Sequence, residues 1–121
     1  MKKINDVSMS KYTTYKTGGN VKTMYFPESI EELENLIKEL KSNKEKFILI
    51  GNGSNLIVDD NDFDGSVINL KEINNYELND TKLYCECGVM LPVVANKMVA
   101  ESLSGLEWAI SIPGTVGASI L

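Results

Sequence analysis

The chain has 121 residues, a formal net charge of −5, and hydrophobic and charged fractions of 43% and 24%. These values are typical of one globular domain or part of one. The acidic balance argues against a nucleic-acid partner, and no apolar run approaches the ~20 residues that span a membrane. Without histidine or arginine, the chain offers neither a His-based triad nor a guanidinium clamp. The first six residues precede no hydrophobic segment, so we expect no signal peptide and a cytoplasmic protein.

The first half of the chain predicts a strand, a helix and a second strand. Residues 1–20 are extended and polar, whereas residues 21–26 alternate as a half-buried strand does and stop at Pro27. Ser29 and Glu32 form a capping box, which predicts a helix ending at residues 42–43. The strand at residues 47–50 completes a unit that we expect to be parallel and right-handed. The apolar stripe of the helix comprises Ile30, Leu33, Leu36, Ile37 and Leu40.

The second half predicts a hairpin and a second helix. Short strands are expected at residues 56–58 and 66–70, and a boundary at 74–75, so we divide the chain into domains at 1–70 and 71–121. Residues 76–78 and 82–87 form the hairpin. Pro92 can occupy the first turn of a helix that Gly105 ends, and residues 106–110 form a short turn. The apolar stripe of this helix includes Val94, Met98 and Val99.

Two glycine-containing loops suggest a phosphate-bearing ligand. Residues 51–55 separate two apolar runs and contain two glycines, a serine and two asparagines, so no bulky side chain covers their amides. Such amides can form a concavity for a phosphate. Residues 112–118 form a second loop of this kind. However, Leu56 stands where a dinucleotide fingerprint needs its third glycine, and no Walker-type lysine follows. A tight turn between strands therefore remains an open alternative.

Other candidate sites favour structural interpretations. Residues 60–65 match the first half of a calcium loop, but Lys71 stands where the bidentate glutamate belongs, which favours an acidic turn. Cys85 and Cys87 share one face of a strand, and zinc would need two further ligands, so we interpret both as core residues. Trp108 can stack on a ring system or simply pack. We expect no metal site.

Three segments, in this order and spacing, carry a family resemblance: residues 12–20, 51–58 and 105–118. The chain resembles the UDP-N-acetylenolpyruvoylglucosamine reductases over nearly all of its length. The resemblance implies an α+β fold of the PCMH type, shared with vanillyl-alcohol oxidases, in which two α/β subdomains grip FAD. Here the second subdomain would be truncated and the substrate domain absent.

The resemblance also implies cofactor-binding residues. The pyrophosphate of FAD would be wrapped by the first glycine loop, namely Gly51, Asn52, Gly53, Ser54 and Asn55, together with Leu56. The second side of the cofactor would be lined by Ile112, Pro113, Gly114, Thr115, Gly117 and Ala118. The N-terminal segment that approaches the cofactor would contribute Tyr15, Lys16, Gly18 and Gly19.

The implied reaction reduces UDP-N-acetylglucosamine enolpyruvate to UDP-N-acetylmuramate during peptidoglycan synthesis, with NADPH as reductant. The catalytic serine, arginine and glutamate of the family would lie beyond Leu121, so we assign no catalytic residue and expect this chain alone to be inactive. Two alternatives remain open: a non-catalytic flavin-binding remnant or module, and an α+β protein whose glycine turns bind nothing. An unprotected sheet edge beside the hairpin further predicts self-association.

Overall fold

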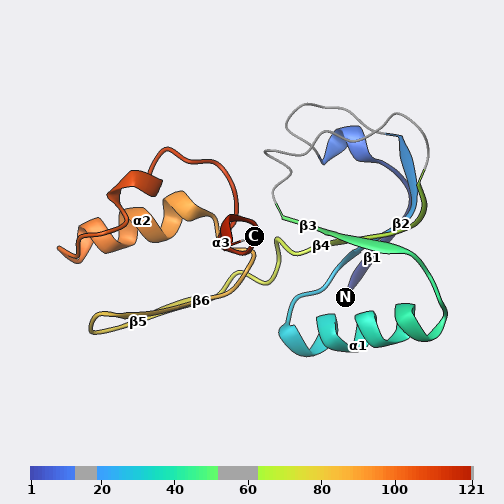
Figure 1. Cartoon of the computed structure of the whole chain (residues 1–121), viewed down its shortest axis with the longest axis horizontal. Coiled ribbons are helices and arrows are strands. Elements are labelled where there is room, and N and C mark those ends of the chain that lie inside the picture. Colours follow the sequence, from blue (N-terminus) through green and yellow to red (C-terminus); the bar gives the residue numbers. More distant parts are fainter. Residues whose placement is uncertain (13–18, 52–62, 121) are drawn as a thin grey trace.

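The computed structural model describes residues 1–12, 19–51 and 63–120. Figure 1 shows two groups of elements joined by the segment that follows strand β4. The first group is a four-stranded sheet with helix α1, and the second is a two-stranded sheet with helices α2 and α3. The described residues contain no helix that is both long and apolar enough to cross a membrane.

The four-stranded sheet has the order β1-β2-β4-β3. Its strands are β1 (Lys2–Ser8), β2 (Asn20–Phe26), β3 (Phe47–Ile50) and β4 (Phe63–Asn69). Strand β1 runs antiparallel to β2, whereas β2 and β3 both run parallel to β4. The predicted strands at 21–26, 47–50 and 66–70 are confirmed. Strand β1 was expected only as an extended segment, and the strand expected at 56–58 lies outside the described residues.

The position of β4 corrects the simplest interpretation of the strand–helix–strand unit. Strands β2 and β3 are parallel, as expected, but they are not neighbours because β4 lies between them. Val67 and Ile68 of β4 are both fully buried, and a strand buried on both faces belongs in the middle of a sheet. Leu49 of β3 is 49% exposed, which suits an edge strand.

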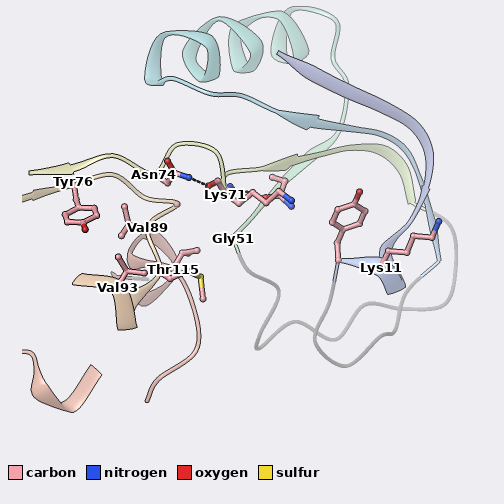
Figure 2. Close-up of a pocket in the computed structure, with 12 residues that line it drawn as sticks. Lys11, Gly51, Lys71, Asn74, Tyr76, Val89, Val93 and Thr115 are labelled. Atoms are coloured by element: carbon pink, nitrogen blue, oxygen red, sulfur yellow. Dashed lines mark hydrogen bonds between the residues drawn. The ribbon is translucent and has the colours of Figure 1, made fainter. Parts of the chain in front are cut away.

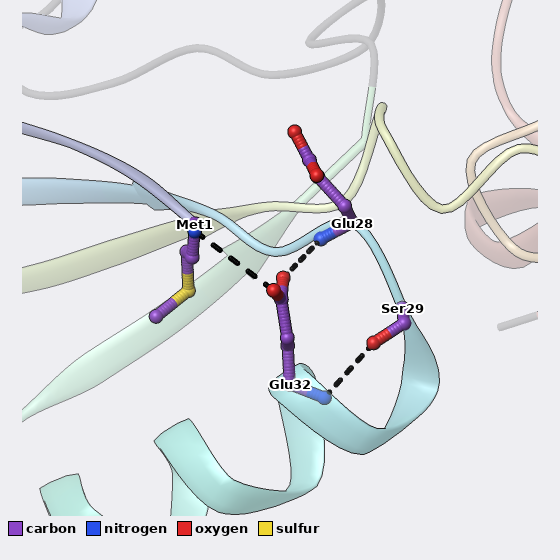
Figure 3. Close-up of polar contacts among 4 residues, drawn as sticks. All are labelled: Met1, Glu28, Ser29 and Glu32. Carbon is purple, nitrogen blue, oxygen red and sulfur yellow. Dashed lines mark hydrogen bonds and ion pairs between the residues drawn. The ribbon is translucent and has the colours of Figure 1, made fainter.

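Helix α1 (Ile30–Ser42) covers one face of this sheet. Leu36 and Leu40 pack with Ile68 there, and Leu33 and Ile37 pack against them. Ile30 is 43% exposed, so its expected place on the apolar stripe is wrong. The predicted capping box is present: the Glu32 amide donates to Ser29 Oγ at 3.1 Å. The Glu32 carboxylate, however, accepts from the amide of Glu28 at 2.8 Å, one residue before the N-cap (Figure 3).

The opposite face of the sheet is covered by η1 (Met9–Lys11), a short 3₁₀ turn that follows β1. Met9 and Met24 are fully buried in the cluster on this face, and Val21 joins them. The β2–β4 register shifts between Val21 and Thr23, as in a bulge. This shift accounts for two core residues spaced by three rather than by two positions.

The second group begins with the predicted hairpin, β5 (Tyr76–Asn79) and β6 (Lys82–Cys85). Its two-residue turn is Asp80-Thr81, with Asp80 at φ 58°. Strand β6 ends two residues earlier than expected, and Cys85 and Cys87 are half-buried rather than core residues.

Helix α2 (Leu91–Ala100) has Pro92 in its first turn, as predicted. It ends at Ala100, and the prediction that Gly105 ends it is wrong. Ser102 supplies the left-handed residue (φ 58°), and its amide donates to the Val99 carbonyl at 3.0 Å. Val99 is 47% exposed, so its expected place on the apolar stripe is also wrong.

A short 3₁₀ turn, η2 (Glu107–Ala109), and helix α3 (Val116–Ile120) complete the second group. The turn expected at residues 106–110 is therefore confirmed. Leu91, Ala95 and Ala109 form a small buried cluster against which Val116 packs. The division into domains at residues 70 and 71 stays a prediction.

Candidate functional site

A cleft of about 680 Å³ lies between the two groups of elements. Its volume falls within the ~300–1,000 Å³ of small-molecule and cofactor sites. The first group contributes residues from η1 and from the carboxyl ends of β3 and β4: Lys11, Tyr12, Gly51, Asn69 and Lys71. The facing wall includes Tyr76, Met90, Val93 and Thr115, and Figure 2 shows both walls.

Gly51, the described residue of the first glycine loop, meets Thr115 of the second loop in this cleft. A Cβ atom on Gly51 would overlap Thr115 Oγ1 and lie 3.2 Å from its Cγ2. Thr115 is only 2% exposed, so its side chain has little room to move aside. Only a residue without a side chain fits at position 51, because Thr115 fills the space where a Cβ atom would lie. The phosphate-binding role of this turn stays a prediction.

Backbone hydrogen bonds attach the second loop to the start of α2. The Leu91 amide donates to the Gly114 carbonyl at 2.9 Å, and the Val116 amide donates to the Val89 carbonyl at 2.8 Å. This pair of bonds forms an isolated antiparallel bridge that holds Thr115 in place. Gly114 has φ +131°, a conformation that favours glycine.

The same bonds reduce the number of amides that this loop can offer to a ligand. The Val116 amide is engaged, and the Gly117 amide donates to the Cys87 carbonyl at 3.0 Å. A Cβ on Gly117 would lie 2.7 Å from Cys87 Cβ, so Gly117 serves this close packing. The Ala118 amide faces Thr115 Oγ1 at 3.4 Å. Within the described parts of the chain, the amides of Gly114 and Thr115 donate no hydrogen bond.

The structure brings together only some of the predicted site residues. Gly51 and Thr115 line the cleft, whereas the other described members do not: Gly19, Ile112, Pro113, Gly114, Gly117 and Ala118. The carbonyl of Gly19 accepts a bond from the Met9 amide at 3.0 Å. The remaining predicted residues lie outside the described ranges: Tyr15, Lys16, Gly18, Asn52, Gly53, Ser54, Asn55 and Leu56.

Sequence reasoning missed the segment between the groups. Asn69, Lys71, Asn74 and Tyr76 all line the cleft. The Asn74-Asn75 pair was interpreted as a boundary, and a segment that joins two units necessarily borders the space between them. The predicted boundary was therefore the sequence feature that could have indicated these cleft-lining residues. Gly88 also lines the cleft. A Cβ atom on it would lie 2.6 Å from the Ile73 carbonyl oxygen, so this position requires glycine.

The other candidates from the sequence were a metal site, the two cysteines and Trp108, and neither the cysteines nor Trp108 line the cleft. No group of metal-ligating side chains occurs among residues 1–12, 19–51 and 63–120. Burial, followed by the charge of Glu86, raises the pKa of the Cys85 thiol, and burial likewise raises the pKa of Cys87. Trp108 is 61% exposed and its indole donates to the Gly105 carbonyl at 2.9 Å.

Comparison with known proteins supplies the family. Residues 21–121 match a family described as FAD binding domain. UDP-N-acetylenolpyruvoylglucosamine reductase of Caldicellulosiruptor saccharolyticus is 36% identical over 117 residues, which is 97% of this chain and 38% of the relative. The enzyme of the same name from Carboxydothermus hydrogenoformans is 42% identical over 113 residues, 93% of this chain and 37% of the relative.

A solved structure agrees. The crystal structure of UDP-N-acetylenolpyruvylglucosamine reductase from Thermus caldophilus matches 98% of this chain and 40% of its own, with a TM-score of 0.76 and 29% identity. The chain thus spans about two fifths of the length of the relatives it matches. The expected mixed α and β fold and the resemblance drawn from three motifs are confirmed. The family match, which covers residues 21–121, shows that the chain belongs to the FAD binding domain family.

Proposed function

We propose that the cleft binds FAD, with the diphosphate beside the contact between Gly51 and Thr115. The observation that carries this proposal is that Gly51 and Thr115, one residue from each glycine loop, line the same cleft. A backbone without a side chain can come close to phosphate oxygens, and charge-assisted hydrogen bonds contribute about 1.5–3 kcal/mol each. The amide of Thr115, which lines the opposite wall, would donate to the diphosphate.

We further propose the roles of the predicted residues outside the described ranges. Asn52, Gly53, Ser54, Asn55 and Leu56 continue directly from Gly51, so the same backbone would wrap the diphosphate. Tyr15, Lys16 and Gly18 would approach the cofactor from the segment that follows Tyr12, which lines the cleft. Gly51 and Thr115 then mark the junction of two FAD-binding subdomains, residues 1–70 and 71–121.

For the whole protein we propose the activity for which the relatives are named. It would reduce UDP-N-acetylglucosamine enolpyruvate to UDP-N-acetylmuramate in peptidoglycan synthesis, with NADPH as reductant. The enzyme would act in the cytoplasm, and its product would contribute to the cell wall that maintains cell shape. Bound FAD would supply the redox chemistry. The residues of this chain would bind and orient the cofactor, and the chain alone would not turn over substrate.

A non-catalytic flavin-binding module is the second candidate. It shares the cleft and the cofactor with the first, so FAD binding supports both. What separates them is turnover by the protein that carries this chain together with the remaining length of its relatives.

The test of cofactor binding is a titration of the purified chain with FAD, followed by flavin fluorescence and by equilibrium dialysis. We expect saturable binding of one FAD per chain. A chain that stays folded, as judged by circular dichroism, and yet binds no FAD would contradict the proposal. In a parallel assay with NADPH and the enolpyruvyl substrate, the chain alone should show no turnover.

A further inference from the structure

The backbone of the second loop offers little positive charge to a diphosphate. The amides of Val116 and Gly117 are engaged by carbonyl oxygens of their own chain. The amides of Gly114 and Thr115 remain, and they are uncharged donors. Both phosphates of a dinucleotide carry negative charge, so further positive charge in the cleft would strengthen binding.

Lys71 stands where it can supply that charge. It lines the cleft, and its main chain is held on both sides: its amide donates to Asn69 Oδ1 at 3.0 Å, and its carbonyl accepts from Asn74 Nδ2 at 3.1 Å (Figure 2). Asn69 is 3% exposed, so this support is itself buried. These bonds fix the main chain of Lys71 beside the cleft.

The head group of Lys71 has a defined neighbour. Its Nζ lies 5.3 Å from the centre of the buried Phe26 ring, within the range of a cation–π contact. No carboxylate of the described residues forms an ion pair with it, because the ion pairs found there involve Met1 with Glu32 and Lys97 with Glu101. The charge of Lys71 is therefore not neutralised by that part of the chain.

Lys11 is the second cation of the cleft. It belongs to η1, which comes before β2, whereas Lys71 follows β4, so two distant parts of the sequence place a lysine on the same wall. Lys11 likewise forms no ion pair within residues 1–12, 19–51 and 63–120.

We propose that Lys71 and Lys11 bind the diphosphate of the dinucleotide through their ammonium groups, alongside the backbone amides. This inference rests on the proposed function. It assigns two residues of the described chain that the glycine motifs do not include.

The experiment compares FAD affinity at low and at high salt for the wild-type chain and for the substitutions Lys71→Gln, Lys11→Gln and both together. Each single substitution should weaken FAD binding by about fivefold at low salt, the upper range for a charge pair exposed to water. The double substitution should also flatten the salt dependence, because salt screens the interactions that the variant lacks.

Two further variants keep the test specific. Lys71→Arg retains the charge and should keep most of the affinity. Lys38→Gln removes an exposed charge from α1, outside the cleft, and should bind FAD like the wild type.

The inference is overturned if the double variant binds FAD with wild-type affinity and wild-type salt dependence, or if Lys38→Gln loses as much affinity as Lys71→Gln. These outcomes are distinct from failure of the proposed function. The proposed function fails when the wild-type chain itself binds no FAD.

Discussion

The contact between Gly51 and Thr115 gives the sharpest test of the cleft. Replacing Gly51 by alanine adds a Cβ that overlaps Thr115 Oγ1 and lies 3.2 Å from Cγ2. Gly51 does not have the positive φ found at Gly105 and Gly114, so the alanine backbone itself carries no strain at this position. The effect of the substitution therefore comes from the contact across the cleft.

The expected magnitude follows from overpacking. Inserting one methyl group into a closely packed contact typically costs about 1–3 kcal/mol. If the whole packing cost is lost from the free energy of FAD binding, because the two loops no longer align, FAD affinity decreases by about 5- to 150-fold. Thr115→Ala removes both Oγ1 and Cγ2. The remaining Thr115 Cβ would then lie 3.4 Å from the added Cβ, which is an ordinary contact.

A double-mutant cycle measures this coupling. The dissociation constant of FAD is determined by fluorescence for the wild type, Gly51→Ala, Thr115→Ala and the double variant. The double variant should recover most of the affinity that Gly51→Ala loses. Thr81→Ala, in the exposed hairpin turn, is the matched control and should leave affinity unchanged. The reasoning is refuted if Gly51→Ala binds FAD normally, or if the two losses simply add.

Three further predictions concern stability and association. Ser29→Ala removes the N-cap acceptor of α1 and should lower the free energy of unfolding by about 1 kcal/mol, whereas Ser29→Asp should retain it in the same denaturant titration. Because burial raises the pKa of Cys85 and Cys87 in the folded state, that state holds thiol protons that the unfolded state releases, so stability should fall as pH rises above about 8.5. Unfolding measured across this range should show a smaller fall for the Cys85→Ser, Cys87→Ser double variant, and an equal fall would count against a thiol origin. The two-stranded β5–β6 sheet has unpaired outer edges among the described residues, so we still expect self-association, and a monomer in sedimentation at high concentration would argue against it.

Local sequence patterns predicted most of the elements. The capping pair Ser29 and Glu32, the apolar stripe of α1, the hairpin after residue 75 and Pro92 at the start of α2 all act through residues a few positions apart. Their geometry is set by short-range hydrogen bonds and by side-chain periodicity, which a sequence displays directly. The end of α2 was wrong because a serine took the left-handed conformation that glycine usually provides.

The candidate site was predicted only in part. The glycine loops were interpreted as phosphate-binding backbone because their residues leave the amides uncovered, and that role stays a prediction. Which of those amides stay available depended on Val89 and Cys87, whose carbonyls engage the second loop and are not adjacent to it in sequence. Lys71 carried no motif and became a candidate only because Asn69 and Asn74 hold it at the cleft.

The sequence by itself determined the kinds of elements, their order along the chain and the family to which they belong. Only the tertiary structure decided that β4 lies between β2 and β3, that Gly51 meets Thr115, and that two lysines share a wall of the cleft. The physical reason is that strand order and loop contact depend on how the whole chain buries its apolar surface. A strand such as β4, which is buried on both faces, belongs in the middle of a sheet, and its position there sets where the neighbouring loops emerge.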